Sequence, residues 1–411
     1  MKLRHYILLM TAFAVISDAI LIPFYPQFFA ARYHLTSSVH AGAYVASISI
    51  VVMVSLQFWS RVARRVDAMH ILVRTQCAAG VLAVLSYWAP SVPVFWAISL
   101  AMFSCKSAYL LMCPYMMRHE PSDEHAPLLA LLTVIGTFSA IFGGLAGGAL
   151  MDHWGTRFCL FAMAAGDFLN MLICTHLIRA RRIARQCVSA EAEQEQGTAV
   201  PSKGWIKRLP ILRLALMLSI YSFSISVILP FLSSYWQVVG NTSSKLVSGF
   251  VYEIPGMMAL AGLLANRLVS ERVKQRLDPL LLNLALAAGG LLLQSTGHAV
   301  LIVAGLALFG WASFRITVRL SVVIFRLSRP ADYAADYSLI NFFQYSGALI
   351  ASFSAGLIVS AYGMRAPFLI AAAGVIATLV FDALLIKVDR VAARSPEGAA
   401  IAETGELARA H

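Results

Sequence analysis

Five of the charged side chains inside apolar runs long enough to cross a membrane are assigned to the interior of the protein. Asp18 and Glu253 are the acids, and Lys106, Arg315 and Arg319 are the bases. A charge in hydrocarbon costs about 2.5–3.5 kcal/mol on insertion scales, so these residues are functional candidates. Burial favours the protonated form of a carboxyl group, which predicts proton exchange at the two acids. The bases are predicted to bind substrate.

The spacing of these charges predicts how they pair. Lys106 lies far from either end of the apolar run 93–117, so it needs a buried counter-ion, and Asp18 is the expected partner. Arg315 and Arg319 are four residues apart and share a helix face. They are expected to face the interior, with Glu253 near one of them. Three bases against two acids favour a substrate with anionic or several polar groups.

Other polar residues of the same runs receive supporting roles. Tyr109, Asn341 and Gln344 are predicted to hydrogen-bond the substrate. Asp167 is expected to form a structural pair or hydrogen bond that takes no part in transport. Asp336, at the start of its helix, suits the positive end of the helix dipole and is expected to pair with loop arginines as a gate.

The elements that position these residues are predicted membrane helices. Of the 411 residues, 59% are hydrophobic and 13% are charged, which predicts an all-α membrane protein. The first run has no small-residue cleavage site and is expected to be retained as a helix. Twelve spans can be placed, at 6–30, 39–60, 70–90, 93–117, 126–151, 158–178, 209–238, 245–266, 279–297, 299–325, 334–360 and 366–387.

An internal repeat organises these spans. Shifting residues 139–166 by 208 positions aligns them with residues 347–374. Matching pairs include Gly148/Gly356, Gly155/Gly363, Arg157/Arg365 and Gly166/Gly374. The chain is therefore predicted to form two six-helix halves, 1–178 and 209–390. Residues 179–208 are expected to be a cytoplasmic linker, and 391–411 a disordered cytoplasmic tail.

Charge and composition exclude several classes of function. The net charge of +12 comes from Lys and Arg concentrated on one predicted side of the membrane, which places both termini in the cytoplasm. Nucleic-acid binding is therefore not expected. The protein is expected to lie in a bacterial inner membrane. The six cysteines show no metal-ligand spacing, and phosphate-binding loops and nucleophile constellations are absent from the sequence. We expect no metal, no cofactor and no enzymatic activity.

Three stretches resemble motifs of the major facilitator superfamily, and the resemblance covers the whole chain. Asp18, Pro23 and Pro26 are similar to the D-x(4)-P-x-x-P signature in the first helix of its drug/proton antiporters. Gly143, Gly144, Gly147 and Gly148 resemble G-x(3)-G-P-x-x-G-G, with Ser139 and Gly144 replacing the first Gly and the Pro. Arg64, Arg65 and Asp67 occupy the place of G-x-L-x-D-R-x-G-R-R/K, without its glycines.

This resemblance implies two parallel six-helix repeats around a central cavity. It implies that the prolines and loop charges help gate the cavity and that the glycines seal it between the halves. The function it implies is a monomeric, proton-driven antiporter in the lipid bilayer that exports a small organic compound. One alternative is a proton-coupled symporter importing an anionic metabolite or siderophore. Another is a sensor on the same scaffold that transports nothing.

Overall fold

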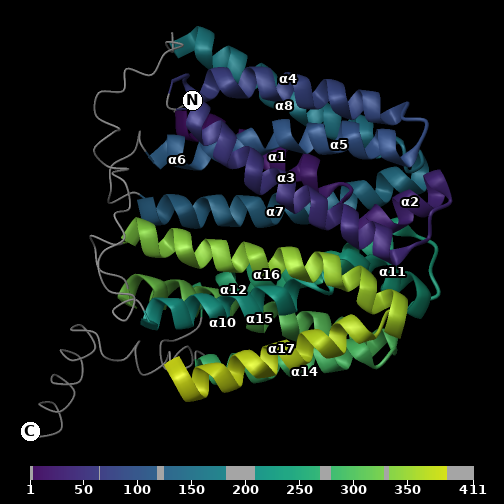
Figure 1. The fold of residues 1–411 in the computed structure, drawn as a ribbon, viewed down its shortest axis with the longest axis vertical. Coiled ribbons are helices and arrows are strands. Elements are labelled where there is room, and N and C mark those ends of the chain that lie inside the picture. Colours follow the sequence, from purple (N-terminus) through teal and green to yellow (C-terminus); the bar gives the residue numbers. More distant parts are fainter. Residues whose placement is uncertain are drawn as a thin grey trace, which may run out of the picture. The chain divides into compact units, whose positions relative to one another are not determined.

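The computed structural model describes residues 3–63, 65–117, 125–181, 209–268, 279–327 and 333–386. These residues are helical throughout, with short connecting turns and no β-strand (Figure 1). Eleven of their helical segments are long and apolar enough to cross a membrane, and Leu280–Ser295 is a shorter apolar helix. The predicted all-α membrane architecture is confirmed.

The helices follow the predicted spans closely, with several spans divided into shorter pieces. Up to residue 181 they are α1 (Leu3–Ala19), η1 (Ile22–Phe24), α2 (Tyr25–Tyr33), α3 (Ser38–Val62), α4 (Ala68–Tyr87), α5 (Val92–Lys106), η2 (Ser107–Leu111), α6 (Met112–Met117), α7 (His125–His153) and α8 (Phe158–Arg181). From residue 209 they are α10 (Leu209–Ser226), α11 (Leu229–Val239), α12 (Lys245–Leu268), α14 (Leu280–Ser295), α15 (Ala299–Leu327), α16 (Tyr333–Tyr362), α17 (Ala366–Phe381) and η6 (Asp382–Ile386).

Prolines interrupt the first span of each half. Pro23 and Pro26 lie at the first turns of η1 and α2, after α1 has ended at Ala19. Proline cannot donate a helical hydrogen bond but fits the first turn of a new helix. Pro230 likewise follows the start of α11, after α10 has ended at Ser226. The first predicted span is therefore divided into α1, η1 and α2.

The span that carries Lys106 is also interrupted, which the sequence analysis did not predict. The α-helix α5 ends at Lys106 and continues as the 3₁₀ turn η2 before α6 begins. The Ser107 hydroxyl bonds back to the Ser104 carbonyl at 2.8 Å. Lys106 therefore lies at the junction of two helical pieces.

The repeat is visible in two equivalent turns. Gly155 between α7 and α8 has φ +89°, and Gly363 between α16 and α17 has φ +82°. Side chains rarely adopt this left-handed conformation, whereas glycine does so freely. The match of the two glycines at a shift of 208 residues therefore reflects the same backbone turn in each half.

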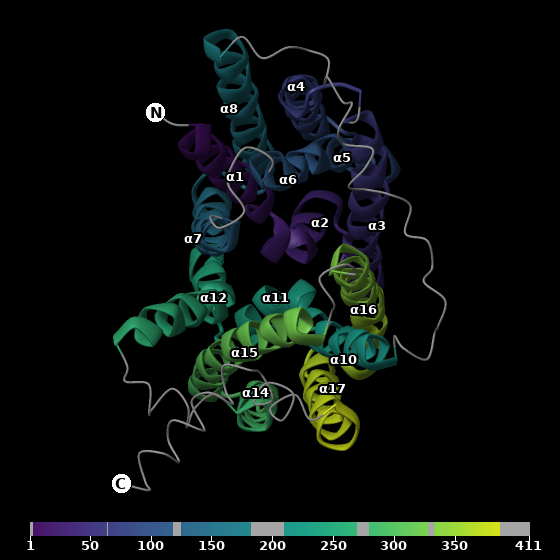
Figure 2. The same cartoon turned by 90° about the vertical axis from the view of Figure 1, so that its left-hand side faces the viewer.

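The chain divides into two compact units. The first contains residues Met1–Thr198, Leu229–Gly256 and Ser352–Met364, and the second contains the remaining residues. In the first unit α1 packs against both α7 and α8, while α4 packs against α5 and α8 (Figure 2). Its core includes an aromatic cluster around Tyr25, Phe29, Tyr44 and Phe95. In the second unit α14 packs against α15 and α17.

Candidate functional site

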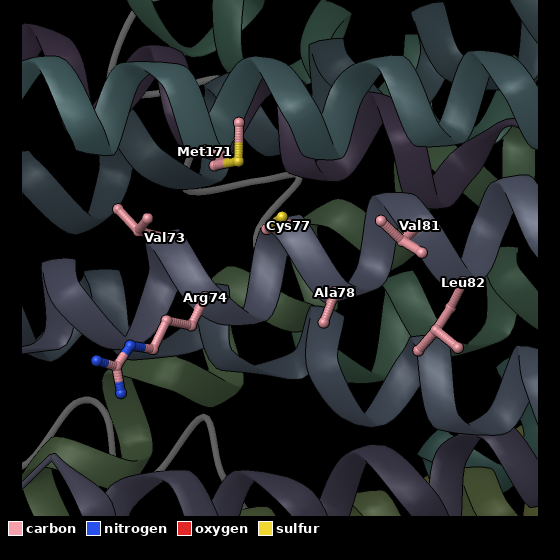
Figure 3. Close-up of a pocket in the computed structure, with 7 residues that line it drawn as sticks. All are labelled: Val73, Arg74, Cys77, Ala78, Val81, Leu82 and Met171. Atoms are coloured by element: carbon pink, nitrogen blue, oxygen red, sulfur yellow. The ribbon is translucent and has the colours of Figure 1, made fainter.

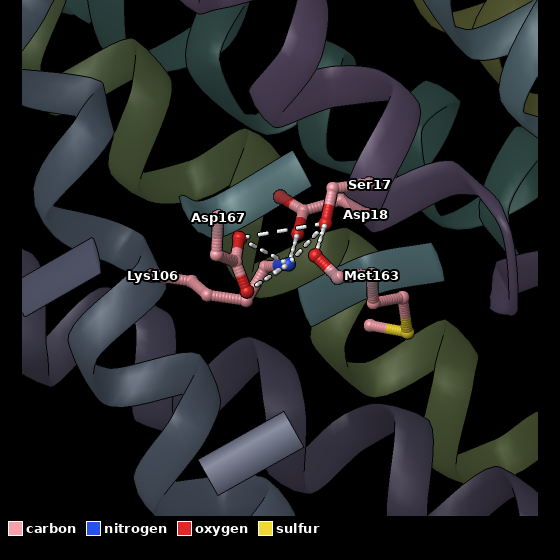
Figure 4. A network of polar contacts seen from close by, with 5 residues as sticks. All are labelled: Ser17, Asp18, Lys106, Met163 and Asp167. Carbon is pink, nitrogen blue, oxygen red and sulfur yellow. Dashed lines mark hydrogen bonds and ion pairs between the residues drawn. The ribbon is translucent and has the colours of Figure 1, made fainter. Parts of the chain in front are cut away.

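A buried ion network links α1, α5 and α8 in the first unit (Figure 4). The Lys106 ammonium nitrogen lies 3.0 Å from Asp18 Oδ1 and 2.9 Å from Asp167 Oδ1. It also donates a hydrogen bond of 2.7 Å to the Ser17 hydroxyl. Asp18 therefore contacts the lysine as an ion-pair partner, whereas Ser17 and Asp167 also accept hydrogen bonds from it. The predicted ion pair between Lys106 and Asp18 is present.

The two acids of this network differ in exposure. The side chain of Asp18 is 21% exposed, whereas that of Asp167 is 1% exposed. Asp167 contacts the lysine through both oxygens, because its Oδ2 also accepts a hydrogen bond of 3.3 Å. Ser17 donates to the Met163 carbonyl at 2.8 Å, which ties α1 to α8 beside the network. Asp167 is the enclosed partner of Lys106, and Asp18 is the accessible one.

Asp167 is the member of the network that the sequence analysis assigned to a structural role only. The sequence does indicate a special position here. Asp167 is an acid in an apolar run and directly follows Gly166, which matches Gly374 in the internal repeat. A side chain on Gly166 would meet Ser17, with its Cβ 2.8 Å from the serine Cβ, so the glycine lets α8 approach α1. Sequence spacing alone could not show this contact, because the two helices are about 150 residues apart.

The structure corrects the charge count used to infer the substrate. Among described charged side chains, the buried bases are Lys106 and Arg315, and the buried acids are Asp167, Glu253, Asp336 and Asp382. The sequence analysis found a surplus of bases because it counted neither Asp167 nor the acids at helix ends. Among the described buried residues acids therefore outnumber bases, and the anionic substrate inferred from the five interior charges remains a prediction.

Glu253 is a second buried acid of the first unit. Its residue is 7% exposed and lies in α12, two positions before the proline inside that helix, Pro255. Its carboxylate packs on Gly144 of α7, where an added Cβ would lie 2.6 Å from Oε1. Within the described part of this unit, the carboxylate makes no hydrogen bond or ion pair. The predicted proximity of Glu253 to Arg315 or Arg319 remains a prediction.

The glycines of α7 form two stripes that face different helices. Gly143 packs against Ile16 and Ala19 of α1, and Gly147 lies against the carbonyl oxygen of Ile20, directly after the end of that helix. Gly144 and Gly148 pack against α12, where an added Cβ on Gly148 would lie 2.5 Å from the Lys245 carbonyl oxygen. Two pairs of glycines four residues apart thus allow close backbone approach on both sides of one helix.

Asp152, at the end of α7, caps the start of α12. Its Oδ1 accepts a hydrogen bond from the Lys245 amide, and its Oδ2 accepts one from the Leu246 amide, both at 2.9 Å. The Ser244 hydroxyl donates to the same carboxylate at 2.8 Å. A carboxylate at a helix start both satisfies unbonded amides and suits the helix dipole. We call this set of contacts the Asp152 clamp.

A related helix crossing occurs between α16 and α3. Gly356, the repeat partner of Gly148, packs against the start of α3, where an added Cβ would lie 2.5 Å from the Ser38 carbonyl oxygen. The residue equivalent to Asp152 is Ser360, whose hydroxyl donates to Leu357 within its own helix at 2.8 Å. The close crossing is therefore repeated, but the carboxylate cap belongs to α7 alone.

The remaining predicted substrate residues are distributed over both units. In the first unit Tyr109 lines a cavity of about 240 Å³ with Thr11, Cys113 and Thr133. In the second unit Arg315 is buried, with its guanidinium 5.1 Å from the centre of the Trp311 ring. Arg319, Asn341 and Gln344 are half-buried in that unit.

The loop residues predicted to gate the cavity have a simpler local role where the structure describes them. Asp67 caps α4 by accepting a hydrogen bond of 2.9 Å from the Met69 amide. Arg65 is exposed, and Arg64 lies outside the described residues. Asp336 is buried in the first turn of α16. The predicted linker from residue 182 onward and the predicted tail also lie outside the described residues. The gating roles remain predictions.

A bundle of apolar helices around a buried ion network defines a multi-pass membrane protein of the transporter class. The family model described as Major Facilitator Superfamily matches residues 7–318. The chain belongs to this superfamily, as its motifs predicted. Membership indicates a transporter of small molecules rather than an enzyme.

Curated relatives and solved structures agree with this assignment. The chain is 23% identical over 260 residues to the multidrug resistance protein MdtG of Klebsiella pneumoniae (strain 342). It is 24% identical over 264 residues to MdtG of Salmonella typhi. These matches cover 61% of this chain and 62% and 63% of the relatives' lengths, so the chain aligns with less than two thirds of each relative.

Two solved structures share the fold at low sequence identity. The nucleoside transporter NupG superposes with a TM-score of 0.70 and 13% identity, covering 93% of this chain and 99% of that one. A bacterial homologue of the human lysosomal transporter Spinster gives a TM-score of 0.66 and 11% identity, covering 95% and 96%. At such identities the likeness concerns the fold.

Proposed function

We propose that this protein is a proton-coupled antiporter that exports a small organic compound across a bacterial inner membrane by alternating access. The observation that carries the proposal is the buried network in which one base, Lys106, faces two acids, Asp18 and Asp167. With both acids ionised the network has a net charge of −1. A single proton would make it neutral, which is the favoured state away from water.

Asp18 is the acid that we assign to proton exchange. It is the more exposed of the two, and its protonation would leave Lys106 paired with Asp167. A cargo that interacts with ionised Asp18 would compete with the proton for that site. Such competition biases the two access states of a transporter in opposite directions. Glu253 is the second candidate for proton binding.

The charges of the first unit favour a neutral or cationic cargo near this network. Lys106 is already matched by two carboxylates, so it has no excess positive charge to offer an anion. The likeness to multidrug resistance proteins is consistent with export of such compounds. The chosen direction rests on this likeness and on the antiporter motifs in α1 and α7.

A proton-coupled symporter that imports an anionic metabolite remains the second candidate. The observation in its favour is Arg315, a buried base in the second unit, followed by Arg319 four residues later. Under this proposal the anion binds the arginines, and proton and cargo move in the same direction.

Comparison of cells with and without the intact protein tests these proposals. Untargeted mass spectrometry of medium and cytosol identifies the cargo, with Asp18→Asn as the matched variant. We expect a compound enriched in the medium only with the intact chain. The same compound is then loaded into proteoliposomes under an imposed pH gradient. Enrichment inside the cells would support the symporter, and transport that ignores the pH gradient would contradict proton coupling.

A further inference from the structure

A groove on the exposed side of α4 and α8 is separate from the ion network. It has a volume of about 630 Å³ and is lined by Val73, Arg74, Cys77 and Val81 of α4 and Met171 of α8, among others (Figure 3). Nearly all of its lining is apolar, with Arg74 the charged residue. We call it the α4–α8 groove.

The surroundings of the groove have the character of a lipid-facing surface. Val81 and Leu85 of α4 are 46% and 47% exposed, and Leu172 of α8 is 57% exposed. Both helices belong to segments long and apolar enough to cross a membrane. Large apolar side chains exposed on such segments are expected to contact acyl chains.

Arg74 is unusual on this surface because it lies about two turns inside the membrane-spanning helix. Its side chain is exposed, and among the described residues it makes no hydrogen bond or ion pair. Arg179 of α8 is exposed as well. Figure 1 shows that α4 starts and α8 ends on the same side of the first unit. An exposed guanidinium at this depth can reach the level of the lipid headgroups, where it is available to an anionic partner.

We propose that the α4–α8 groove binds one anionic phospholipid, with its phosphodiester on Arg74 and an acyl chain along α4 toward Val81. Guanidinium groups bind phosphate oxygens in a bidentate manner, which makes arginine the fitting residue for this headgroup. From Arg74 to Leu82 the helix rises about 12 Å, which gives the acyl chain a continuous apolar track. Basic pockets between membrane helices commonly recognise anionic lipid headgroups.

The lining of the groove distinguishes a lipid from a soluble anion. A free phosphate ion would need several polar partners to replace its hydration, whereas the groove supplies Arg74 against apolar side chains. A zwitterionic lipid carries its own cationic group beside the phosphate, so Arg74 increases its binding affinity less. The proposal concerns lipid binding and stands independently of the transport direction.

Native mass spectrometry of the full-length protein tests the proposal. The purified protein is mixed with equal amounts of phosphatidylglycerol and phosphatidylcholine, and the retained lipids are counted. We expect one retained phosphatidylglycerol. Arg74→Gln should reduce this retention about fivefold, the effect of one basic residue beside an anionic headgroup. Arg157→Gln, at an exposed arginine at the opposite end of α8, is the matched control and should not change it.

A second variant tests the apolar part of the groove. Val81→Trp fills the apolar part of the α4–α8 groove without changing the charge of the groove. It should also lower phosphatidylglycerol retention. Thermal unfolding in detergent confirms that each variant is folded. Retention unchanged by Arg74→Gln, or equal retention of both lipids, would overturn the proposal. Displacement of the lipid by millimolar inorganic phosphate would show binding through the headgroup alone and would also contradict it.

Discussion

Lys106 contacts residues of two other helices, and the stability of the fold depends on all of these contacts. Its ammonium group contacts Asp18, Asp167 and the Ser17 hydroxyl. Removing one partner of a buried ion pair leaves an uncompensated charge, which is far more costly than the pair was worth. The variants of this network should therefore have unequal effects.

The first prediction concerns Lys106→Gln. It leaves two carboxylates side by side away from water, and we expect a loss of about 3–5 kcal/mol in the free energy of unfolding. Asp167→Asn should cost less, because Lys106 keeps Asp18 as a counter-ion. Unfolding in mixed micelles measures both. The double variant Lys106→Gln with Asp167→Asn should recover part of the loss, and an additive result would contradict the ion network.

The second prediction uses two glycines of α7 that differ in their surroundings. A Cβ on Gly147 would collide with the Ile20 backbone carbonyl, which cannot rotate away, whereas the Gly136 position has no neighbour within 4 Å. Gly147→Ala should therefore separate α1 from α7 and destabilise the protein by about 1–3 kcal/mol. Gly136→Ala should be neutral or stabilising by up to about 1 kcal/mol, from the better helix propensity of alanine. Equal effects would show that the close approach is not essential.

At the scale of elements, α7 contacts the backbone of α12 in two ways. The Asp152 clamp fixes the first amides of α12, and the stripe of Gly144 and Gly148 brings the two helices together. By sequence these helices belong to different predicted halves of the chain. Any movement of one predicted half relative to the other that separates them must first break the clamp.

The third prediction follows from the clamp. Asp152→Ala removes the acceptor for two amides and should cost about 1 kcal/mol locally, as loss of a helix cap does. Hydrogen exchange of the Lys245 and Leu246 amides should become faster. Ser360→Ala is the matched control in the equivalent position and should leave exchange at the start of α3 unchanged. Protection that persists in Asp152→Ala would argue against the clamp.

Some elements could be predicted from the sequence and others could not. The proline break after Ala19 follows from local chemistry, because proline lacks an amide donor. The interruption at Lys106 lies within an apolar run, which has no periodic signal to mark it. The pairing of Asp167 depends on the approach of α8 to α1, a tertiary contact. Hydropathy reports burial in the membrane and carries no information on which helices touch.

At the scale of the whole molecule, the two predicted halves contain the same turn, which depends on glycine. Gly155 and Gly363 both have positive φ, and neither has a neighbour within 4 Å of its Cβ position. Substitution should therefore act through backbone strain alone.

The fourth prediction compares these two turns. Gly155→Ala and Gly363→Ala should each destabilise by about 1–2 kcal/mol, the cost of a left-handed conformation for a residue with a Cβ. The double variant should show an additive loss, because the turns share no neighbours. Thermal unfolding of the three variants tests this. A large difference between the single variants would mean that the turns are not equivalent.

The two glycine stripes of α7 also have an evolutionary consequence. Backbone atoms of α1 and α12 occupy the space where a side chain at Gly143, Gly147 or Gly148 would project. Substituting the neighbouring residue does not remove its backbone atoms. A second substitution therefore cannot compensate for a side chain added at these positions. Natural variants of this chain should therefore diversify at Gly136 and keep glycine at positions 143, 147 and 148. A helix with glycine on two faces is thereby constrained in sequence from both sides.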